Sequence, residues 1–416
     1  MIRHSPSSTS TSTIRIAFFA VMLLAIPAPC MADIVLDWNQ HGVSAVLTAR
    51  QLPPDGARTM AIMHVAMFNA VNAIEHRYRS YGNDLHVPPR ASSATAAAAA
   101  AHSVLLRLFP EQRETIEKGW TESLAQLPGD RNIEAGIALG EQAADQCIGM
   151  RLGDGVGSIN RYRPLTTSGA YVPTTLPVSY DWREVKPWIL DRPSQFRPEP
   201  PPALTSPIWA RDYNEVKGLG ERDSKVRTAE QTESAQFWTA VGVVTWNPIV
   251  RALATAKPRG LLDNARLFAL VNMAANDAFI AVFDAKYAFN FWRPITAIRN
   301  GDIDGNDATA PDPAWLPFVD TPLHPEYPCA HCISAGAVAA VLEAEFGAGN
   351  VGPIAMTSAT APGVTRRWQR IADYVTEVNH ARIWGGIHYR TSTEVGERMG
   401  RAIGALAVAS ALQRLP

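Results

Sequence analysis

The sequence predicts an all-α protein made of two helical bundles joined by a long, proline-rich irregular connection. Residues 41–80, 92–150 and most of the chain after Arg227 are rich in Ala, Leu, Met and Glu. Their apolar residues recur every three to four positions, as on one face of a helix. Residues 155–225 instead contain ten prolines, which interrupt helices. The two helical parts also resemble each other, which favours an internal duplication.

The duplication rests on four pairs of segments that occur in the same order in both halves. Similar composition of Ala-rich helices is the alternative for any one pair, but it does not require a shared order. The pairs predict a degenerate N-terminal bundle at 33–154, a connecting segment at 155–226 and a second bundle at 227–416. The paired segments are Ala57–Ala61 with Ala265–Ala269, Leu85-His86 with Leu323-His324, Ala98–Phe109 with Ala335–Phe346, and Gly140-Glu141 with Gly396-Glu397.

Residues 1–32 are interpreted as a signal peptide. A leader with Arg3 and Arg15 precedes an apolar run that ends at Ile26. The run suits the core of a signal peptide and is short for a membrane span. Cleavage after Ala32 predicts an exported protein, periplasmic or extracellular, and no later segment is expected to cross a membrane.

Composition limits the partners. The formal net charge of -1 gives no electrostatic footprint for nucleic acid, so nucleic-acid binding is not expected. Cys147, Cys329 and Cys332 follow the leader, and an odd number of cysteines does not indicate a disulfide framework. Stability is therefore expected to come from packing.

The first motif whose residues could form a functional site is Lys286-x6-Arg293-Pro294. A spacing of seven is two helical turns, so both cations are expected on one face, and Pro294 is expected to end the helix. Two solvated charges are the simple alternative. The aromatic neighbours Phe291 and Trp292 favour burial, and two buried cations need an anion between them.

The second motif runs from His324 to Cys332 and leads into an Ala-rich helix. Pro328 suits the first turn of a helix, so the main-chain N–H groups of Ala330 and His331 form an anion site at the helix start. His331 could then donate a proton to a bound oxyanion. A histidine that only caps or packs there is the alternative.

The third motif is Arg382-x5-His388. Gly385 and Gly386 should end the helix that carries Arg382, so that the chain can turn and bring His388 to the same point. A glycine-rich turn with incidental polar residues is the alternative for this motif alone. Together the three motifs provide three cations, a helix N-terminus and two histidines, which suit a phosphate-like trianion.

In order and spacing, these motifs resemble the superfamily that joins vanadium-dependent haloperoxidases and type-2 phosphatidic acid phosphatases. The family signature is Lys-x6-Arg-Pro, then Pro-Ser-Gly-His, then Ser-Arg-x5-His-x3-Asp. The resemblance covers roughly residues 230–405, and the first half resembles the additional bundle of the haloperoxidase branch. His324 also resembles the His-Pro-x-Tyr-Pro arrangement of algal bromoperoxidases.

The resemblance implies a role for each residue of the motifs. Lys286, Arg293 and Arg382 would bind the equatorial oxygens of the oxyanion. His388 would bond to vanadium or attack phosphorus, and His331 would act as acid and base. We therefore expect a haloperoxidase-like enzyme that uses vanadate, hydrogen peroxide and halide. The alternatives are an acid phosphatase that needs no cofactor and forms a phosphohistidine, and a non-catalytic oxyanion-binding descendant.

Departures from the signature bear on activity. Ser392 stands where the family has the Asp that orients the last histidine, and loss of that carboxylate should weaken His388. Glu326 or Glu394 are the carboxylates that could replace it.

Two further departures lie at the expected helix start. Cys329 and Ala330 replace the family's Ser and Gly. Both residues are still expected to bind the oxyanion, although a thiol is a poorer hydrogen-bond donor than a hydroxyl. The Cys329-x-x-Cys332 spacing also leaves a redox pair or a zinc site open as minor alternatives.

Overall fold

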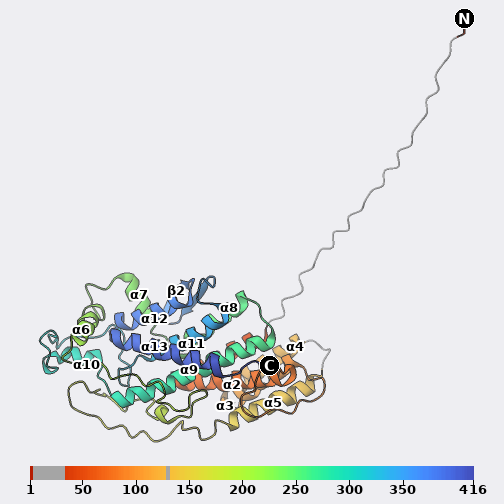
Figure 1. The fold of residues 1–416 in the computed structure, drawn as a ribbon, viewed down its shortest axis with the longest axis horizontal. Helices are drawn as coiled ribbons and strands as arrows, with labels where there is room; N and C mark the ends of the chain where they lie inside the picture. Colours follow the sequence, from red (N-terminus) through yellow and green to blue (C-terminus); the bar gives the residue numbers. More distant parts are fainter. Residues whose placement is uncertain (3–32, 128–131) are drawn as a thin grey trace. The chain divides into compact units, whose positions relative to one another are not determined.

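The computed structural model describes residues 33–127 and 132–416 together with Met1 and Ile2. The predicted signal peptide therefore lies almost wholly outside the described residues. From Asp33 onward helices dominate, and the predicted all-helical class is confirmed (Figure 1). The N-terminal bundle contains α1 (Ile34–Thr48), α2 (Pro53–Glu75), α3 (Ser93–Leu108), α4 (Arg113–Gln126) and α5 (Ile133–Gly149).

Local chemistry explains where these helices begin. Pro53 and Pro54 occupy the first positions of α2, where the missing N–H costs nothing, and so residues 41–80 form parts of two helices rather than one. Ser92 caps α3 by accepting from the Thr95 N–H, and Asn132 caps α5 in the same way.

The connecting segment is irregular for most of its length, as predicted, but it contains a helix that the proline count did not predict. This helix, α6 (Pro207–Leu219), begins at Pro207 after the cap Ser206. A proline in the first turn starts a helix rather than breaking it. The segment is fixed to the core by Trp188, whose main-chain N–H donates to Asp277 Oδ1 over 2.7 Å.

The C-terminal bundle holds the remaining elements. A β-hairpin interrupts the helices, with Ile354 opposite Trp368. The elements are α7 (Ala229–Phe237), α8 (Asn247–Ala256), α9 (Leu261–Phe289), α10 (Pro294–Arg299), α11 (Ala330–Phe346), β1 (Ile354–Ser358), β2 (Ala361–Trp368), α12 (Ile371–Trp384) and α13 (Arg390–Ser410).

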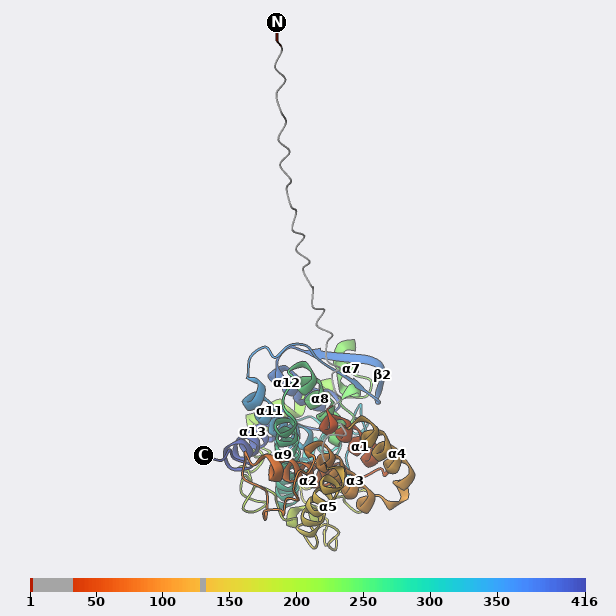
Figure 2. The same ribbon diagram turned by 90° about the vertical axis from the view of Figure 1, so that its right-hand side faces the viewer.

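Helix α9 is the central helix of the fold. It packs on α2 from the first bundle and on α11 and α13 from the second (Figure 2). By length and composition it could cross a membrane, contrary to the expectation that no later segment would be apolar enough. Its apolar stretch is wholly buried by protein, which explains the all-round hydrophobic pattern without a bilayer.

Helices α11 and α13 approach each other closely, and this contact positions the site. A Cβ at Gly396 would lie 2.7 Å from the Cys329 main-chain oxygen, a separation that side-chain atoms do not adopt. Glycine at this position therefore lets α13 lie directly against the start of α11. The histidine that precedes α13 and the histidine in the first turn of α11 belong to one rigid unit.

Candidate active site

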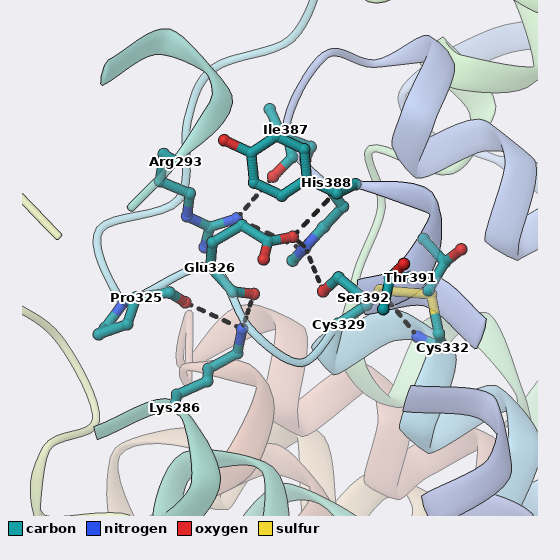
Figure 3. Close-up of polar contacts among 12 residues, drawn as sticks. Lys286, Arg293, Pro325, Glu326, Cys329, Cys332, Ile387, His388, Thr391 and Ser392 are labelled. Atoms are coloured by element: carbon teal, nitrogen blue, oxygen red, sulfur yellow. Dashed lines mark hydrogen bonds and ion pairs between the residues drawn. A yellow bond between two sulfur atoms is a disulfide. The ribbon is translucent and has the colours of Figure 1, made fainter. Parts of the chain in front are cut away.

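Lys286 lies in the last turn of α9 and is fully buried. Its Nζ donates to the main-chain oxygens of Pro325 at 2.9 Å and Glu326 at 2.7 Å (Figure 3). Burial and the charge of Arg293 lower the pKa of the amine well below its usual value. An anion nearby would favour the charged amine, so this is a suitable position for an anion-binding cation.

Arg293 reaches the site by a different route from the one predicted. Helix α9 ends at Phe289 because Asn290 adopts a left-handed conformation with φ of 49°, so Arg293 does not lie two turns beyond Lys286 on the same helix. Arg293 instead caps α10, and Pro294 begins that helix rather than ending α9. Its extended backbone, expected before a proline, directs the guanidinium inward.

The Arg293 guanidinium is held by the chain segments that carry the other two motifs. Its Nε donates to the His324 main-chain oxygen and one terminal nitrogen donates to the Ile387 oxygen, both over 2.9 Å. The same terminal nitrogen lies 3.4 Å from His388 Nε2. Burial lowers the pKa of Arg293 to about 10, so the side chain stays charged at neutral pH.

Arg382 supplies the third buried cation from the last turn of α12. One terminal nitrogen donates to the Trp238 main-chain oxygen. Its Nε is buried and has no hydrogen-bond partner among the described residues. Burial, followed by the Arg293 charge, lowers the pKa of Arg382 to about 9. Arg382 also lines the main cavity, so this donor is placed where an anionic ligand could accept from it.

His388 forms a pair with a buried carboxylate. Its Nδ1 lies 2.6 Å from Glu326 Oε1, and both side chains are almost completely buried (Figure 3). Arginine can only donate, so Nε2, which faces Arg293, accepts and Nδ1 carries the proton. Nε2 thus receives only a long contact from Arg293, which a ligand bound at Nε2 would displace, and His388 lines the main cavity.

Electrostatics support a neutral ring at His388. Burial and the charges of Arg293, Lys286 and Arg382 hold its pKa well below the usual value. Burial raises the pKa of Glu326 to about 7, while Lys286 and Arg293 oppose the rise. Glu326 therefore serves as the carboxylate that the Ser392 position lacks. Glu394 does not take this part, because the contact to Nδ1 belongs to Glu326.

His331 lies in the first turn of α11 and also lines the cavity. Its Nε2 lies 3.1 Å from the Ala240 main-chain oxygen, which can only accept, so Nε2 carries a proton and Nδ1 is free to take up another. Burial, followed by the Arg382 charge, lowers the pKa of His331 well below its usual value. His324 Nδ1 accepts from Arg293 over 3.0 Å.

Cys329 and Cys332 form a disulfide at the start of α11. The odd cysteine count did not predict this bond, although the Cys329-x-x-Cys332 spacing had left a redox pair open; the third cysteine, Cys147, is free and buried elsewhere. A disulfide sulfur has no hydrogen to donate, so the Cys329 side chain cannot be the oxyanion donor that was expected. It instead accepts the Cys332 N–H over 3.2 Å as the helix cap.

The disulfide also bears on the zinc alternative. Its sulfurs are not thiolates and cannot ligate zinc in this state. Within residues 33–127 and 132–416, no group of three or more His, Cys, Asp or Glu residues is arranged to hold a metal ion.

A cavity of about 310 Å³ opens beside these residues. Its inner end is formed by Ala330, His331, Arg382 and His388, with His324 close by. Lys286 and Arg293 lie behind that end and are linked to it through Glu326 and His388. The predicted site residues thus come together, and Glu326 joins them as a residue that the motif comparison had left as one of two alternatives.

The charges of the site do not balance internally. Lys286, Arg293 and Arg382 form no salt bridge with any described carboxylate in direct contact, and Glu326 is the carboxylate whose charge acts on both Lys286 and Arg293. Buried cations without matching anions are strongly unfavourable. Fold and site together define a helical protein with a buried, cationic site next to a carboxylate–histidine pair.

Sequence comparison relates the second half of the chain to known proteins. Residues 266–415 match the family described as the VCPO second helical-bundle domain. The vanadium chloroperoxidase of Curvularia inaequalis is 31% identical over 176 residues, 34% of this chain and 28% of that protein. The chain thus spans less than a third of this curated relative.

Solved structures share the fold over most of the chain. A bacterial vanadium-dependent iodoperoxidase superposes with a TM-score of 0.78 at 24% identity, covering 92% of this chain and 97% of that one. A holo-type bacterial vanadium-dependent chloroperoxidase gives 0.69 at 18% identity, covering 86% and 92%. The resemblance to the haloperoxidase-like branch is confirmed.

Proposed function

We propose that the chain is a vanadium-dependent haloperoxidase-like enzyme that oxidises halide with hydrogen peroxide. The observation that carries the proposal is the His388–Glu326 pair facing three buried cations. The unpartnered Nε of Arg382 supports an anionic ligand at this point. We further propose that the enzyme acts after export, in the periplasm or outside the cell.

The donor set fits vanadate. His388 offers an Nε2 lone pair at the inner end of the cavity, and the buried cations match the charge of a tetrahedral oxyanion. Ala330 adds a helix start with its outward N–H groups. When bound, vanadate would activate hydrogen peroxide as a Lewis acid toward attack by halide.

Each residue has a distinct part in this proposal. Glu326 accepts a hydrogen bond from the Nδ1–H of His388. This bond fixes the ring and makes Nε2 a better ligand. Arg382 and Arg293 offset the negative charge of the oxyanion, and Lys286 holds the loop that carries Glu326. His331 takes up and returns a proton at Nδ1.

An acid phosphatase is the second candidate because the same residues suit phosphoryl transfer. His388 Nε2 would then be the nucleophile and His331 the acid. No separate feature of the site favours this reading, and the two-bundle fold supports the first. A non-catalytic anion-binding protein is the remaining outcome of the test.

The test uses the purified chain with and without orthovanadate. Iodide and bromide oxidation with hydrogen peroxide would be measured alongside hydrolysis of an aryl phosphate. The proposal expects halide oxidation that depends on vanadate and is lost in His388→Ala. Aryl phosphate hydrolysis without halide oxidation would instead identify a phosphatase. The absence of both activities would indicate a non-catalytic binding protein.

A further inference from the structure

A short stretch of main chain outside the three sequence motifs supplies acceptors to two residues of the site. Residues 237–240, here called the strap, begin with the last residue of α7. The Trp238 oxygen accepts from Arg382, and the Ala240 oxygen accepts from His331 Nε2 over 3.1 Å. A main-chain oxygen cannot be redirected by side-chain rotation, so the position of the strap decides where both donors are held.

The Trp238 side chain fixes the strap on the side away from the cavity. Its indole is fully buried, and Nε1 donates to Glu377 Oε1 over 2.8 Å. Glu377 and Arg382 both lie on α12, so the helix that carries the cation also carries the carboxylate that holds the strap. A closed circuit of contacts therefore runs from Glu377 through the indole and the main chain of Trp238 to Arg382.

Glu377 also accepts hydrogen bonds from the β-hairpin. Trp368 Nε1 donates to its Oε2 over 2.9 Å, and Arg366 Nε donates to its Oε1 over 3.0 Å. Arg366 forms further salt bridges with Glu230 and Glu233 of α7. Hydrogen bonds to a charged group are stronger than those between neutral groups. Glu377 thus joins β2, α7 and α12, which pack against one another at this point (Figure 1).

The turn of the hairpin holds the beginning of the strap. Ser358 and Thr360 both donate from their hydroxyl groups to the Phe237 main-chain oxygen, over 2.9 Å and 3.0 Å. Neither β1 nor β2, both described in full, contributes a residue to the lining of the main cavity. The hairpin therefore reaches the site through the strap.

We propose that the Glu377–Trp238 pair and the β-hairpin form a positioning device for the oxyanion site. The device keeps the two strap oxygens where they orient the Arg382 guanidinium and hold the Nε2–H tautomer of His331. Glu377 is thus a positioning residue that lies outside the cavity lining. The inference rests on the proposed function for the oxyanion ligand, but the tautomer of His331 can be measured without any ligand.

A role in packing alone is the alternative, because the Trp238 ring also contacts Trp368 and Tyr374. The chain offers a matched control. Trp368 donates the same kind of hydrogen bond to the same carboxylate and contacts the same Tyr374 ring, yet it lies outside the strap. Trp238→Phe and Trp368→Phe each remove one indole N–H from Glu377 and differ in their connection to the site.

The experiment compares these two variants by calorimetric titration with orthovanadate and with inorganic phosphate. We expect Trp238→Phe to weaken binding of both anions at least about fivefold, which corresponds to about one hydrogen bond, and Trp368→Phe by less than about twofold. Both variants should lower the melting temperature by similar amounts, because each loses the same type of contact. Equal weakening of anion binding in the two variants would overturn the inference.

Nitrogen NMR of protein with labelled histidine provides a readout without ligand. The spectrum shows which ring nitrogen of His331 carries the hydrogen, and a His331→Gln sample assigns the signal. We expect the Nε2–H form in the wild type and in Trp368→Phe, and a mixture of the two tautomers in Trp238→Phe. An unchanged Nε2–H form in Trp238→Phe would refute the part of the inference that concerns His331.

A second pair of variants keeps the test valid if Trp238→Phe does not fold. Glu377→Gln replaces one acceptor oxygen by a donor and should weaken anion binding, whereas Glu230→Gln loses an exposed salt bridge and should not. Equal effects of these two changes would count against the device. If the wild type binds neither vanadate nor phosphate, the proposed function fails, and the tautomer of His331 then decides the positioning inference by itself.

Discussion

The helices before the proline-rich connection and those after it differ in what their ends carry. The aligned helices α2 and α9 pack against each other, yet α2 ends at Glu75, whereas α9 continues beyond the equivalent point to Phe289. Lys286 lies in this extension, and Tyr78 occupies the aligned position after the end of α2. Extra helical length thus places a buried cation where the first bundle has none.

The N-termini of α3 and α11 also differ in the side chains that they carry. Ser92 and Cys329 align, and both cap their helices by accepting the N–H of the residue three positions later. The capping role is common to both bundles, while the surroundings differ: α11 carries His331 in its first turn, where α3 has Ala94. The same type of helix cap therefore occurs in both parts of the fold, and the additional side chains near the helix ends of the C-terminal part form the candidate site.

Buried histidines show the contrast most clearly. His64 in the first bundle is fully buried and lies 2.8 Å from the Asn39 amide, with a pKa lowered to about 3 by burial. His388 in the second bundle is equally buried but faces Glu326 and three cations. A neutral amide partner suits a structural histidine, and a carboxylate partner suits a ligand or nucleophile.

The largest expected effect comes from replacing these two histidines. His388→Ala should lower vanadate-dependent halide oxidation at least about a thousandfold, because the ligand itself is lost. His64→Gln should lower the thermal midpoint of unfolding but keep the activity of the folded fraction. Comparable loss of activity per folded molecule in both variants would contradict the difference between the bundles.

Glu326→Gln should have the next largest effect. It keeps the shape of the side chain but removes the charge that orients His388, and vanadate affinity should fall by about 10–100-fold. Calorimetric titration at pH 8 measures this, since Glu326 is then ionised in the wild type. An unchanged affinity would show that the carboxylate only fills space.

The same variant predicts a pH dependence of stability. The pKa of Glu326 is raised from 4.5 to about 7, so its ionisation in the fold is unfavourable, and the wild type loses stability as pH rises through that window. Glutamine carries no such cost. Between pH 4.5 and 7.5 the free energy of unfolding should shift in favour of Glu326→Gln by about 3 kcal/mol. Denaturant unfolding of both proteins without oxyanion gives this difference, and a flat difference would contradict the raised pKa.

Removal of the disulfide should have a smaller effect on stability. It closes a loop of only a few residues, so replacing both cysteines by serine should lower the free energy of unfolding by about 2 kcal/mol. A reductant should lower the melting temperature of the wild type but not that of the double variant. If reductant lowers the melting temperature of both proteins equally, the loss of stability does not come from this disulfide.

The smallest effect is expected at the cap of the first bundle. Ser92→Ala removes the hydrogen bond to the Thr95 N–H and should cost about 1 kcal/mol of stability. Halide oxidation by the folded protein should be unchanged, because Ser92 lies in the bundle without the cationic site. A selective loss of activity would show that the first bundle has a part in the chemistry.

Sequence patterns predicted the features of this structure that depend on residues close together in the chain. Helical periodicity gave the fold class, and the Gly385–Gly386 turn brought Arg382 and His388 together as expected. The patterns were wrong where a single residue changes the chain direction, as at Asn290, which separates Arg293 from α9.

Tertiary contacts explain the remaining differences. The choice of Glu326 over Glu394 depends on how the second motif folds against His388, and spacing alone does not contain that information. The disulfide was only a minor alternative in the sequence, because an odd cysteine count says nothing about a pair three residues apart. The cavity wall combines Leu52, Val178 and Phe283, which no local pattern connects.

Calorimetric titration of the wild type with orthovanadate tests the central claim most directly. The account predicts one tightly bound anion per chain, displaced by inorganic phosphate and absent in His388→Ala. Unsaturable binding, or a saturable site that His388→Ala leaves intact, would contradict an oxyanion site built on the His388–Glu326 pair.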